Sequence, residues 1–286
     1  MKLSYYPGCS LQGTALDYDR SVREVCAALD VELVDIPDWN CCGASSAHMT
    51  SHEIGMRLPM RNLLLNQQGL DILVPCAACY QRLRAADIAL RKNPEYWDVE
   101  DYDPDFGILH ISSFLASEEI NGRIREKVQK DLAGLPVACY YGCLSLRHPK
   151  ITGVEAYEMP ETLETIVGNL GAHPVRWSHR TECCSGSLTM ARPDIARKLV
   201  GDINQAAKRG GAGAFVTDCP MCQANLESRQ LDNDPTDSLP VFFATELIAA
   251  ALSGTYPQKQ RKVHLVAPHI LADIFTAPET VREETS

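Results

Sequence analysis

The chain has 286 residues, which suits two domains of ordinary size. Its formal net charge of −10 argues against a nucleic-acid partner, because no basic stripe is available to replace phosphate counterions. Residues 1–10 lack the basic start and apolar core of a secretory signal. We therefore expect a cytoplasmic protein, a compartment in which structural disulfides are rare.

In the first half, short β-prone runs alternate with amphipathic helical stretches. Strands are predicted over residues 3–6, 31–36 and 71–74, and helices over 14–29, 51–67 and 77–91. Residues 93–106 are acidic, aromatic and interrupted by proline, which indicates a surface excursion or partner contact rather than a flexible linker. A further strand is predicted at 107–111.

The second half repeats this order. Strands are predicted over residues 137–141, 172–176 and 214–217, and helices near 160–169, 193–208 and 220–229. Residues 241–252 read as a strand followed by a helix, and residues 276–286 as a polar tail. The alternation predicts an α/β fold with two pseudo-equivalent domains, residues 1–135 and 136–286. Each is expected to be a mostly parallel sheet flanked by helices.

Ten of the twelve cysteines form one pattern written twice. Each copy has a lone cysteine, then an adjacent pair, then a Cys-x-x-Cys, and every one of these segments follows a predicted strand. Loops at the carboxyl ends of parallel strands meet at one edge of a sheet, so each set is expected to converge. The first set is Cys9, Cys41, Cys42, Cys76 and Cys79, and the second is Cys143, Cys183, Cys184, Cys219 and Cys222.

Five thiols exceed the four ligands of a tetrahedral zinc ion or of a cubane iron–sulfur cluster. The fifth thiol indicates a larger or more open cluster, or a redox-active thiol beside one. Adjacent cysteines on a strand point to opposite faces, so both sulfurs of Cys41 and Cys42 reach one centre only from an irregular loop. Gly43 and Gly186 are expected to give the two loops this freedom.

Other interpretations of the cysteines explain less of the pattern. Disulfides need an oxidising compartment, and inert buried thiols do not explain ten cysteines in register. Structural zinc stays open, because Cys-x-x-Cys is a common zinc-binding element. Cys26, on the apolar face of a predicted helix, and Cys139, in a β-prone run, are assigned to the core, although Cys139 is an alternative to Cys143 as first ligand.

The cysteine segments resemble the duplicated CCG motif of the HdrB family, the cysteine-rich subunits of heterodisulfide reductases, and its relatives. The resemblance runs from about residue 1 to 250 through PGCSL at 7–11, CCGA at 41–44, PCAAC at 75–79, YGCL at 141–144, CCSG at 183–186 and DCPMC at 218–222. It implies that each set of five cysteines holds a non-cubane [4Fe-4S] cluster and that a disulfide is split between the two clusters. One departure is Ser185, which separates the second pair from Gly186 and concerns the loop geometry more than ligation.

The resemblance also implies partners. The chain lacks the Cys-x-x-Cys-x-x-Cys run of small ferredoxins, so its electrons must come from another protein. An HdrC-like ferredoxin subunit, fed by an HdrA-like flavin subunit, is expected to supply them. The alternative function is an electron-transfer subunit of a lactate, glycolate or fumarate type of oxidoreductase, with the chemistry on another chain.

Residues beyond the cysteines carry weaker signals. His48 and His148 follow cysteine segments closely, so either is a candidate proton donor to a departing thiolate, although a structural or surface role is the simpler interpretation for both. Four arginines are candidates for an anionic substrate tail, each with an ordinary helix-surface role as its alternative. They are Arg57, Arg61, Arg147 and Arg192.

Overall fold

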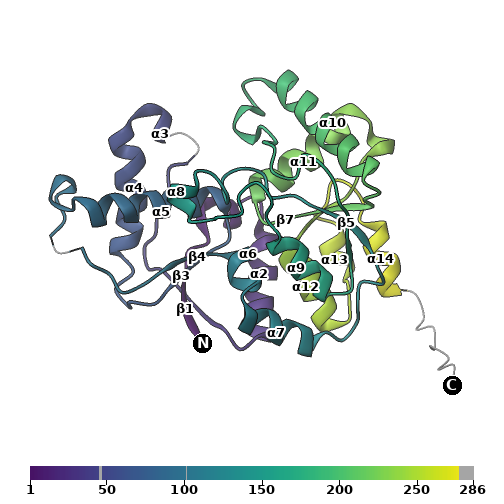
Figure 1. Cartoon of the computed structure of the whole chain (residues 1–286), viewed down its shortest axis with the longest axis horizontal. Helices are drawn as coiled ribbons and strands as arrows, with labels where there is room; N and C mark the ends of the chain where they lie inside the picture. The colour runs from purple at the N-terminus through teal and green to yellow at the C-terminus, as the bar shows by residue number, and fades with distance from the viewer. Residues whose placement is uncertain (45–46, 101, 277–286) are drawn as a thin grey trace.

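Two four-stranded parallel sheets form the centre of the protein (Figure 1). The computed structural model describes residues 1–44, 47–100 and 102–276. The strand orders, β2-β1-β3-β4 and β6-β5-β7-β8, are the same in both halves, so the predicted α/β fold with a repeated parallel sheet is confirmed. The strands are β1 Lys2–Tyr5, β2 Glu32–Asp35, β3 Ile72–Val74, β4 Ile108–His110, β5 Pro136–Cys139, β6 His173–Pro174, β7 Ala214–Thr217 and β8 Val241–Phe243.

Burial differs among the strands. Every residue of the inner strands β3 and β7 is buried, as expected where helices cover both faces of a parallel sheet. The edge strand β2 has no buried residue. β6, an edge strand of the second sheet, has two residues where five were predicted, because only Pro136 and Val137 pair with it.

The helices of the first half match the predicted stretches closely. The buried face of α2 includes Val22, Val25 and Cys26, so Cys26 belongs to the core. Ser51 caps α4 by accepting a hydrogen bond from the backbone N–H of Ile54. The helices up to the acidic excursion are α1 Gly8–Leu11, α2 Leu16–Ala28, α3 Ala47–Thr50, α4 His52–Leu64 and α5 Ala77–Lys92.

In the acidic excursion, of which residues 93–100 and 102–106 are described, the chain forms one 3₁₀ turn, η1 Glu95–Trp97. Tyr96 is 70% exposed, whereas Trp97 is buried and lies beneath the guanidinium of Arg57, 5.9 Å from the ring centre. One aromatic residue therefore anchors the excursion while another faces solvent. The chain then continues through β4 into α6 Ile111–Leu115 and α7 Glu118–Lys127.

The second half follows the same plan and adds a C-terminal pair of helices. The predicted tail beyond Thr276 falls outside the described residues. None of the described helices is long and apolar enough to cross a membrane. The helices are α8 Pro149–Thr152, α9 Thr162–Asn169, η2 Gly186–Leu188, α10 Pro193–Arg209, α11 Pro220–Asn233, η3 Pro235–Asp237, α12 Ala244–Ser253, α13 Gln258–Arg261 and α14 His269–Thr276.

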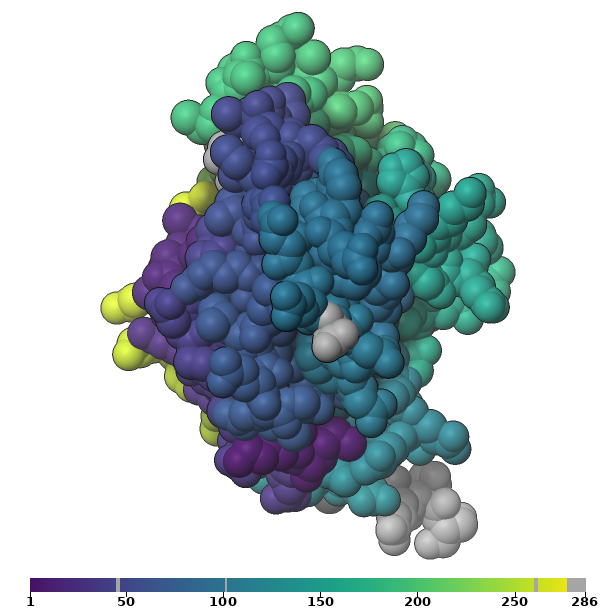
Figure 2. Space-filling view, turned by 90° about the vertical axis from the view of Figure 1, so that its left-hand side faces the viewer, coloured from purple at the N-terminus to yellow at the C-terminus, as the bar shows by residue number. Residues whose placement is uncertain are grey.

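One hydrophobic core runs across both halves. The ring of Tyr18, on α2, stacks on Phe243 at the end of β8, with 3.9 Å between ring centres and 3° between planes. Nearby, the hydroxyls of Ser21 and Thr245 lie 2.7 Å apart. The boundary after residue 135 falls between the two sheets, but the hydrophobic core continues across it. The division into domains 1–135 and 136–286 therefore stays a proposal. Figure 2 shows the blue surface of the first half against green segments of the second.

Candidate metal centres and the cavity between the halves

Each cysteine segment follows the carboxyl end of a strand. Cys9, the pair at 41–42 and the segment 76–79 come after β1, β2 and β3, and their counterparts come after β5, β6 and β7. The parallel pairing brings these ends to one edge of each sheet. The gaps, residues 10–40 and 43–75 in the first half, each hold helix and a returning strand, as the length of a crossover connection requires.

Within each set, sulfur atoms from different loops lie close to one another. In the first set, the Sγ atom of Cys41 lies 3.6 Å from that of Cys9, and Cys42 lies 3.2 Å from Cys79. In the second, Cys143 lies 3.9 Å from Cys183, and Cys184 lies 3.7 Å from Cys222. All twelve cysteines are free, so neither set forms disulfides.

The two sets share a gradient of exposure. Cys9 and Cys183 are exposed, and Cys41 and Cys143 are half-buried. The six remaining cysteines of the sets are buried. Each set therefore has a closed floor, made by the second cysteine of the pair and the Cys-x-x-Cys. Its open mouth is made by the lone cysteine and the first cysteine of the pair. The buried cysteines outside both sets are Cys26 on α2 and Cys139 on β5.

Hydrogen bonds between the thiols of each set shift their pKa values. Hydrogen bonds from neighbouring cysteines are the largest cause of a lowered pKa at four of them, because a donated S–H stabilises the thiolate. The same bonds raise the pKa of the donors, for example Cys143 and Cys222. The acidified thiols and their donors are Cys42 from Cys41, Cys76 from Cys79, Cys183 from Cys143 and Cys184 from Cys222.

The donor set fits iron–sulfur chemistry. Thiolates are the ligands of iron–sulfur clusters, and the pKa values of four thiols of the two sets are lowered, which favours that form. Among the described residues, no group of three or more His, Cys, Asp or Glu side chains encloses a site for a single metal ion. The close sulfur pairs of each set join three loops, so all three loops bring thiols to one place.

Matching tyrosines hold the lone cysteine segment against the paired one. Tyr6 donates a hydrogen bond of 2.7 Å to the carbonyl of Asn40, just before the first pair. Tyr140 does the same to Glu182, also at 2.7 Å, just before the second. Both tyrosines are fully buried. The two loops are therefore fastened to their sheets in the same way.

The loop after the second pair corrects a prediction. Gly43 has φ of 74°, as expected, but the left-handed residue of the second loop is Ser185, with φ of 57°, and Gly186 does not adopt positive φ. The assignment of backbone freedom to Gly186 was therefore wrong. The inserted serine takes the place of glycine directly after the pair, so the loop keeps its left-handed conformation. In the described chain, the buried Ser185 hydroxyl has no hydrogen-bond partner.

Replacing Ser185 by glycine is expected to stabilise the protein by about 1 kcal/mol, because a non-glycine residue in the left-handed region costs about 1–2 kcal/mol. Urea unfolding of the anaerobically purified protein measures the change. Ser187→Gly is the control, since Ser187 is exposed and has no positive φ. There the same substitution should lower the free energy of unfolding. A less stable Ser185→Gly variant would contradict the assignment of strain.

Buried polar groups at the join of the two halves were missed by the sequence analysis. Tyr18 donates to the carbonyls of Pro75, at 3.2 Å, and Asp218, at 3.0 Å, the residues before the two Cys-x-x-Cys segments. His110 lies 3.7 Å from the Asp218 carboxylate, too far for a direct hydrogen bond. Burial raises the pKa of Asp218 and lowers that of His110, which favours the neutral form of both. No regular spacing in the sequence predicts that these residues lie close together.

A cavity of about 220 Å³ lies where the halves meet at the second cysteine set. Its wall on one side is the second set, and its wall on the other comes from the first half, chiefly the start of α5. The lining residues are Cys143, Cys183, Cys184, Cys219 and Cys222 with Tyr141, Leu144, Gly186, Ser187 and Met221, facing Ala44, His48, Ala77, Ala78, Gln81 and Arg82.

The structure separates the predicted histidine and arginine candidates. His48 lines this cavity, although it lies on the half that carries the first set, whereas His148 is exposed and absent from the lining. None of the four predicted arginines lines it either. Arg57 pairs with Glu53 and Asp98, Arg61 with Asp38 and Arg192 with Asp194, and Arg147 is exposed.

Arg82 is the arginine that the sequence analysis missed. It stands three residues after Cys79 on α5, the spacing that puts two side chains on one face of a helix. That spacing was a usable signal. Arg82 lines the cavity that the second cysteine set also lines, and its positive charge helps to lower the pKa of Cys42 in the first set.

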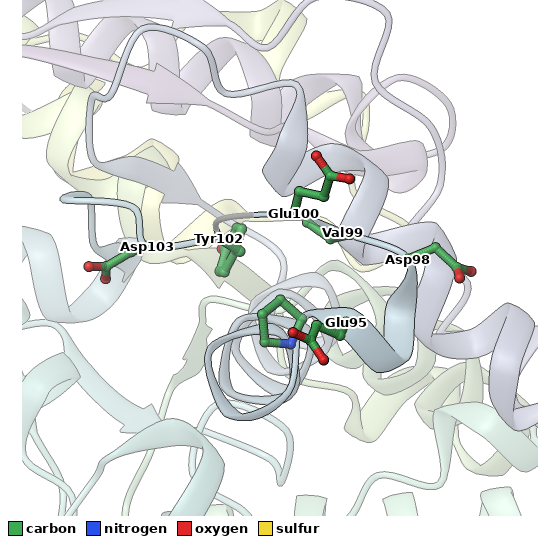
Figure 3. A pocket seen from close by; sticks show the side chains of 7 residues that line it. Glu95, Asp98, Val99, Glu100, Tyr102 and Asp103 are labelled. Carbon is green, nitrogen blue, oxygen red and sulfur yellow. The ribbon is translucent and has the colours of Figure 1, made fainter.

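The acidic excursion encloses a larger hollow of about 810 Å³ (Figure 3). Its carboxylates, among them Asp98, Glu100 and Asp103, spread around the rim instead of converging. Asp98 pairs with Arg57, and Asp103 lies 3.7 Å from Arg91. Among the described residues, none lines both this hollow and the cysteine cavity, so the size of the hollow does not make it the centre of the chemistry.

Comparison with solved structures shows the fold alone. The crystal structure of a hypothetical protein from Helicobacter pylori superposes with a TM-score of 0.69 at 11% identity, covering 93% of this chain. This chain spans about half of that protein, 52% of its length.

Sequence comparisons identify closer relatives. The 8-methylmenaquinol:fumarate reductase membrane anchor subunit of Wolinella succinogenes is 30% identical over 266 residues, which cover 88% of this chain and 92% of the relative. The B subunit of the ferredoxin/F(420)H(2)-dependent CoB-CoM heterodisulfide reductase of Methanosarcina acetivorans is 25% identical, covering 88% and 89%. A protein of Archaeoglobus profundus that is described as similar to the heterodisulfide reductase B subunit is also 25% identical, covering 91% and 93%.

A cysteine-rich domain family, CCG, matches this chain twice, at residues 3–84 and 137–227. The two matches contain the two cysteine sets, and each extends into the helix that carries the Cys-x-x-Cys. The chain belongs to the CCG family of cysteine-rich domain proteins, with the domain present in duplicate.

Proposed function

We propose that the chain is the iron–sulfur subunit of a reductase complex and that it cleaves a disulfide into two thiols. The observation that carries this proposal is the cavity at the join of the halves, where an open cysteine mouth faces a wall from the other half. Its volume of about 220 Å³ accommodates a small molecule rather than a protein segment. The relatives that are reductase subunits support the same class.

Two non-cubane [4Fe-4S] clusters are proposed as cofactors, one on each set of five cysteines. When bound, such clusters supply single electrons, and the reaction R–S–S–R′ + 2e⁻ + 2H⁺ → RSH + R′SH consumes two. The chain's own residues shape the site. The buried cysteines form the floor of each set. Cys143 and Cys183 form the open mouth of the second set, beside the cavity. His48 lies at this cavity and is the proposed proton donor to a departing thiolate.

Partners are proposed on the same basis. Relatives of this chain are subunits of reductase complexes. We propose that an HdrC-like ferredoxin subunit, together with an HdrA-like flavin subunit, delivers the electrons. The proposed location is the cytoplasm. The reverse reaction, thiol oxidation, uses the same site, and the potential of the partner sets the direction.

A second candidate is an electron-transfer subunit of a fumarate type of reductase, with the chemistry on another chain. The observation that favours it is the 30% identity to the Wolinella subunit along 92% of that protein. In this case the cysteine sets relay electrons, and the cavity need not admit a disulfide.

The test is an assay of the anaerobically purified complex against a panel of small disulfides, reading thiol release. The parent is expected to release two thiols for each disulfide. Cys183→Ser removes a mouth ligand, so thiol release should fall at least about tenfold, as loss of metal-site residues commonly does, and bound iron should fall with it.

Cys26→Ser is the matched control, because Cys26 is buried in α2 and lies outside both sets. It should keep its iron and its activity. Parental thiol release by Cys183→Ser would reject disulfide cleavage at this site. If no disulfide is cleaved while the complex passes electrons to fumarate through this chain, the second candidate stands instead.

A further inference from the structure

The hydroxyl of Tyr18 contacts equivalent positions of the two halves. Its oxygen lies 3.2 Å from the carbonyl oxygen of Pro75 and 3.0 Å from that of Asp218. Pro75 and Asp218 correspond to each other, because each directly precedes the first cysteine of its Cys-x-x-Cys. The two Cys-x-x-Cys segments are therefore both held to one atom.

The first half supplies this side chain for both sets. Tyr18 belongs to α2, which β2 follows, and β6 follows α9 in the same way. Counted back from the first residue of each strand, Met159 takes the place of Tyr18. Met159 precedes α9 and is 66% exposed, whereas Tyr18 is fully buried. In the described chain, this link between the segments is therefore made once and is not repeated by symmetry.

The Tyr18 hydroxyl is not needed for packing. Its ring stacks on Phe243, and a phenylalanine would stack in the same way. Burying a hydroxyl costs free energy unless the group is hydrogen-bonded, so its value lies in the two carbonyls that it contacts. Burial raises the pKa of Tyr18 well above its ordinary value, and Asp218, Cys219 and Cys76 raise it further, so the hydroxyl keeps its proton.

Cys76 and Cys219 are the cysteines next to these carbonyls. Both belong to the buried floors of their sets. Each is joined by a single peptide bond to the carbonyl that accepts from Tyr18, so a shift of either segment changes one of its two hydrogen bonds. The Tyr18 hydroxyl thus constrains the position of one floor relative to the other.

We propose that Tyr18 is a positioning residue that fixes the two Cys-x-x-Cys segments relative to each other and thereby sets the interaction between the two metal centres. This inference rests on the proposed function, in which each set carries one cluster and both act on one disulfide. Groups that act on the same bound molecule have to be held within about 0.5 Å of their working geometry. A hydrogen bond shared by both segments supplies this constraint where the two halves meet.

The test reads the interaction between the centres instead of turnover. Electron paramagnetic resonance is recorded on the anaerobic, cluster-loaded complex, poised so that both centres are paramagnetic. The signals of the parent should be split by their interaction. Tyr18→Phe keeps the stacked ring and removes the hydroxyl, so the segments should move apart and the splitting should decrease, with the parental amount of iron bound. Parent signals without any splitting would contradict the proposal before a variant is made.

Hydrogen exchange of the same proteins gives a second measurement. Amide hydrogens of residues 76–79 and 219–222 should exchange about tenfold faster in Tyr18→Phe, in both segments alike, because a buried hydrogen bond is lost. Ser21→Ala is the matched control. Ser21 lies one turn along α2 and is buried, and its hydroxyl contacts the carbonyl of Tyr18 and the hydroxyl of Thr245 instead of a cysteine segment. This variant should leave the splitting and the exchange of both segments unchanged.

The outcomes separate this inference from the proposed function. A parent that binds no iron rejects the proposed function itself. If the parental splitting persists in Tyr18→Phe, or if Ser21→Ala reduces it equally, the link at Tyr18 is disproved while the proposed function stands. If Tyr18→Phe loses iron, loss from both sets with full iron in Ser21→Ala supports the link, and loss of about half of the iron overturns it.

Discussion

Gly142→Ala is expected to deprive the second cysteine set of its iron while the chain stays folded. Gly142 precedes Cys143 and has φ of 65°, a left-handed conformation that costs other residues about 1–2 kcal/mol. A Cβ atom there would lie 2.9 Å from the Sγ atom of Cys222. Because Cys222 is buried at the floor of the set, its sulfur has to leave the position where a ligand is needed.

The measurement is iron and acid-labile sulfide bound per chain, with the absorption spectrum. The first set is untouched by this substitution, so about half of the iron of the parent should remain if each set holds one cluster. Gly8→Ala is the mirror experiment, since a Cβ at Gly8 would lie 2.8 Å from the Cys79 sulfur. It should remove the other half.

Gly134→Ala separates the clash from backbone strain. Gly134 has φ of 73°, but nothing lies within 4 Å of a Cβ placed there. The free energy of unfolding of this variant should fall by about as much as that of Gly142→Ala, but the variant should keep all of its iron. Full iron content in Gly142→Ala would show that the sulfur of Cys222 is not needed where the structure puts it.

His264→Ala is expected to lower the free energy of unfolding by about 3 kcal/mol or more, because removing one partner of a buried ion pair leaves the other uncompensated. Its ring nitrogens lie 2.9 Å from Glu227 on α11 and 2.8 Å from Glu246 on α12. Tyr256 donates a further hydrogen bond to Glu246. The side chain of His264 is fully buried, so this network ties the C-terminal segment to two helices of the second half.

The same network predicts a pH dependence. Burial disfavours the imidazolium, but the carboxylates of Glu246 and Glu227 outweigh it and raise the pKa of His264 from 6.5 to about 10. A group whose pKa is raised on folding stabilises the protein fully below its unfolded pKa. This contribution should therefore be intact below about pH 6.5 and be lost as the pH rises through about 10.

Urea unfolding at several pH values measures both effects. His264→Gln should be less stable than the parent at about pH 6, and the difference should shrink toward about pH 10. His173→Gln is the control, because His173 is exposed on β6. A stability difference that does not change between these pH values would show that His264 is not protonated in the folded protein.

The sequence was most informative where chemistry repeats along the chain. Strand and helix periodicity predicted α5 and α10 to within a residue of their ends, because each carries an apolar face and clear terminal residues. The two cysteine sets were predictable for the same reason: every member follows a strand, and parallel strands end together.

Features that depend on contacts between distant segments were not predictable. Tyr18 meets Pro75 and Asp218 only after two sheets have packed. The left-handed position after the second pair was assigned to Gly186, since residue type is the only guide available without coordinates, but the chain adopts that conformation at Ser185. The spacing from Cys79 could have singled out Arg82, but its place in a cavity shared with the second cysteine set could not be predicted, because that cavity forms only where the two halves meet.

The cavity at the second cysteine set has a consequence for how such a chain arose. One wall belongs to the N-terminal repeat and the other to the C-terminal repeat, so a single repeat encloses nothing. An ancestor with one copy would have had to associate with its own twin, in a twofold dimer, to build the same enclosure. Fusing the twins into one polypeptide then released each wall to change independently. Arg82, three residues after Cys79, has Asn225 as its counterpart three residues after Cys222, and a symmetric dimer forbids such a difference.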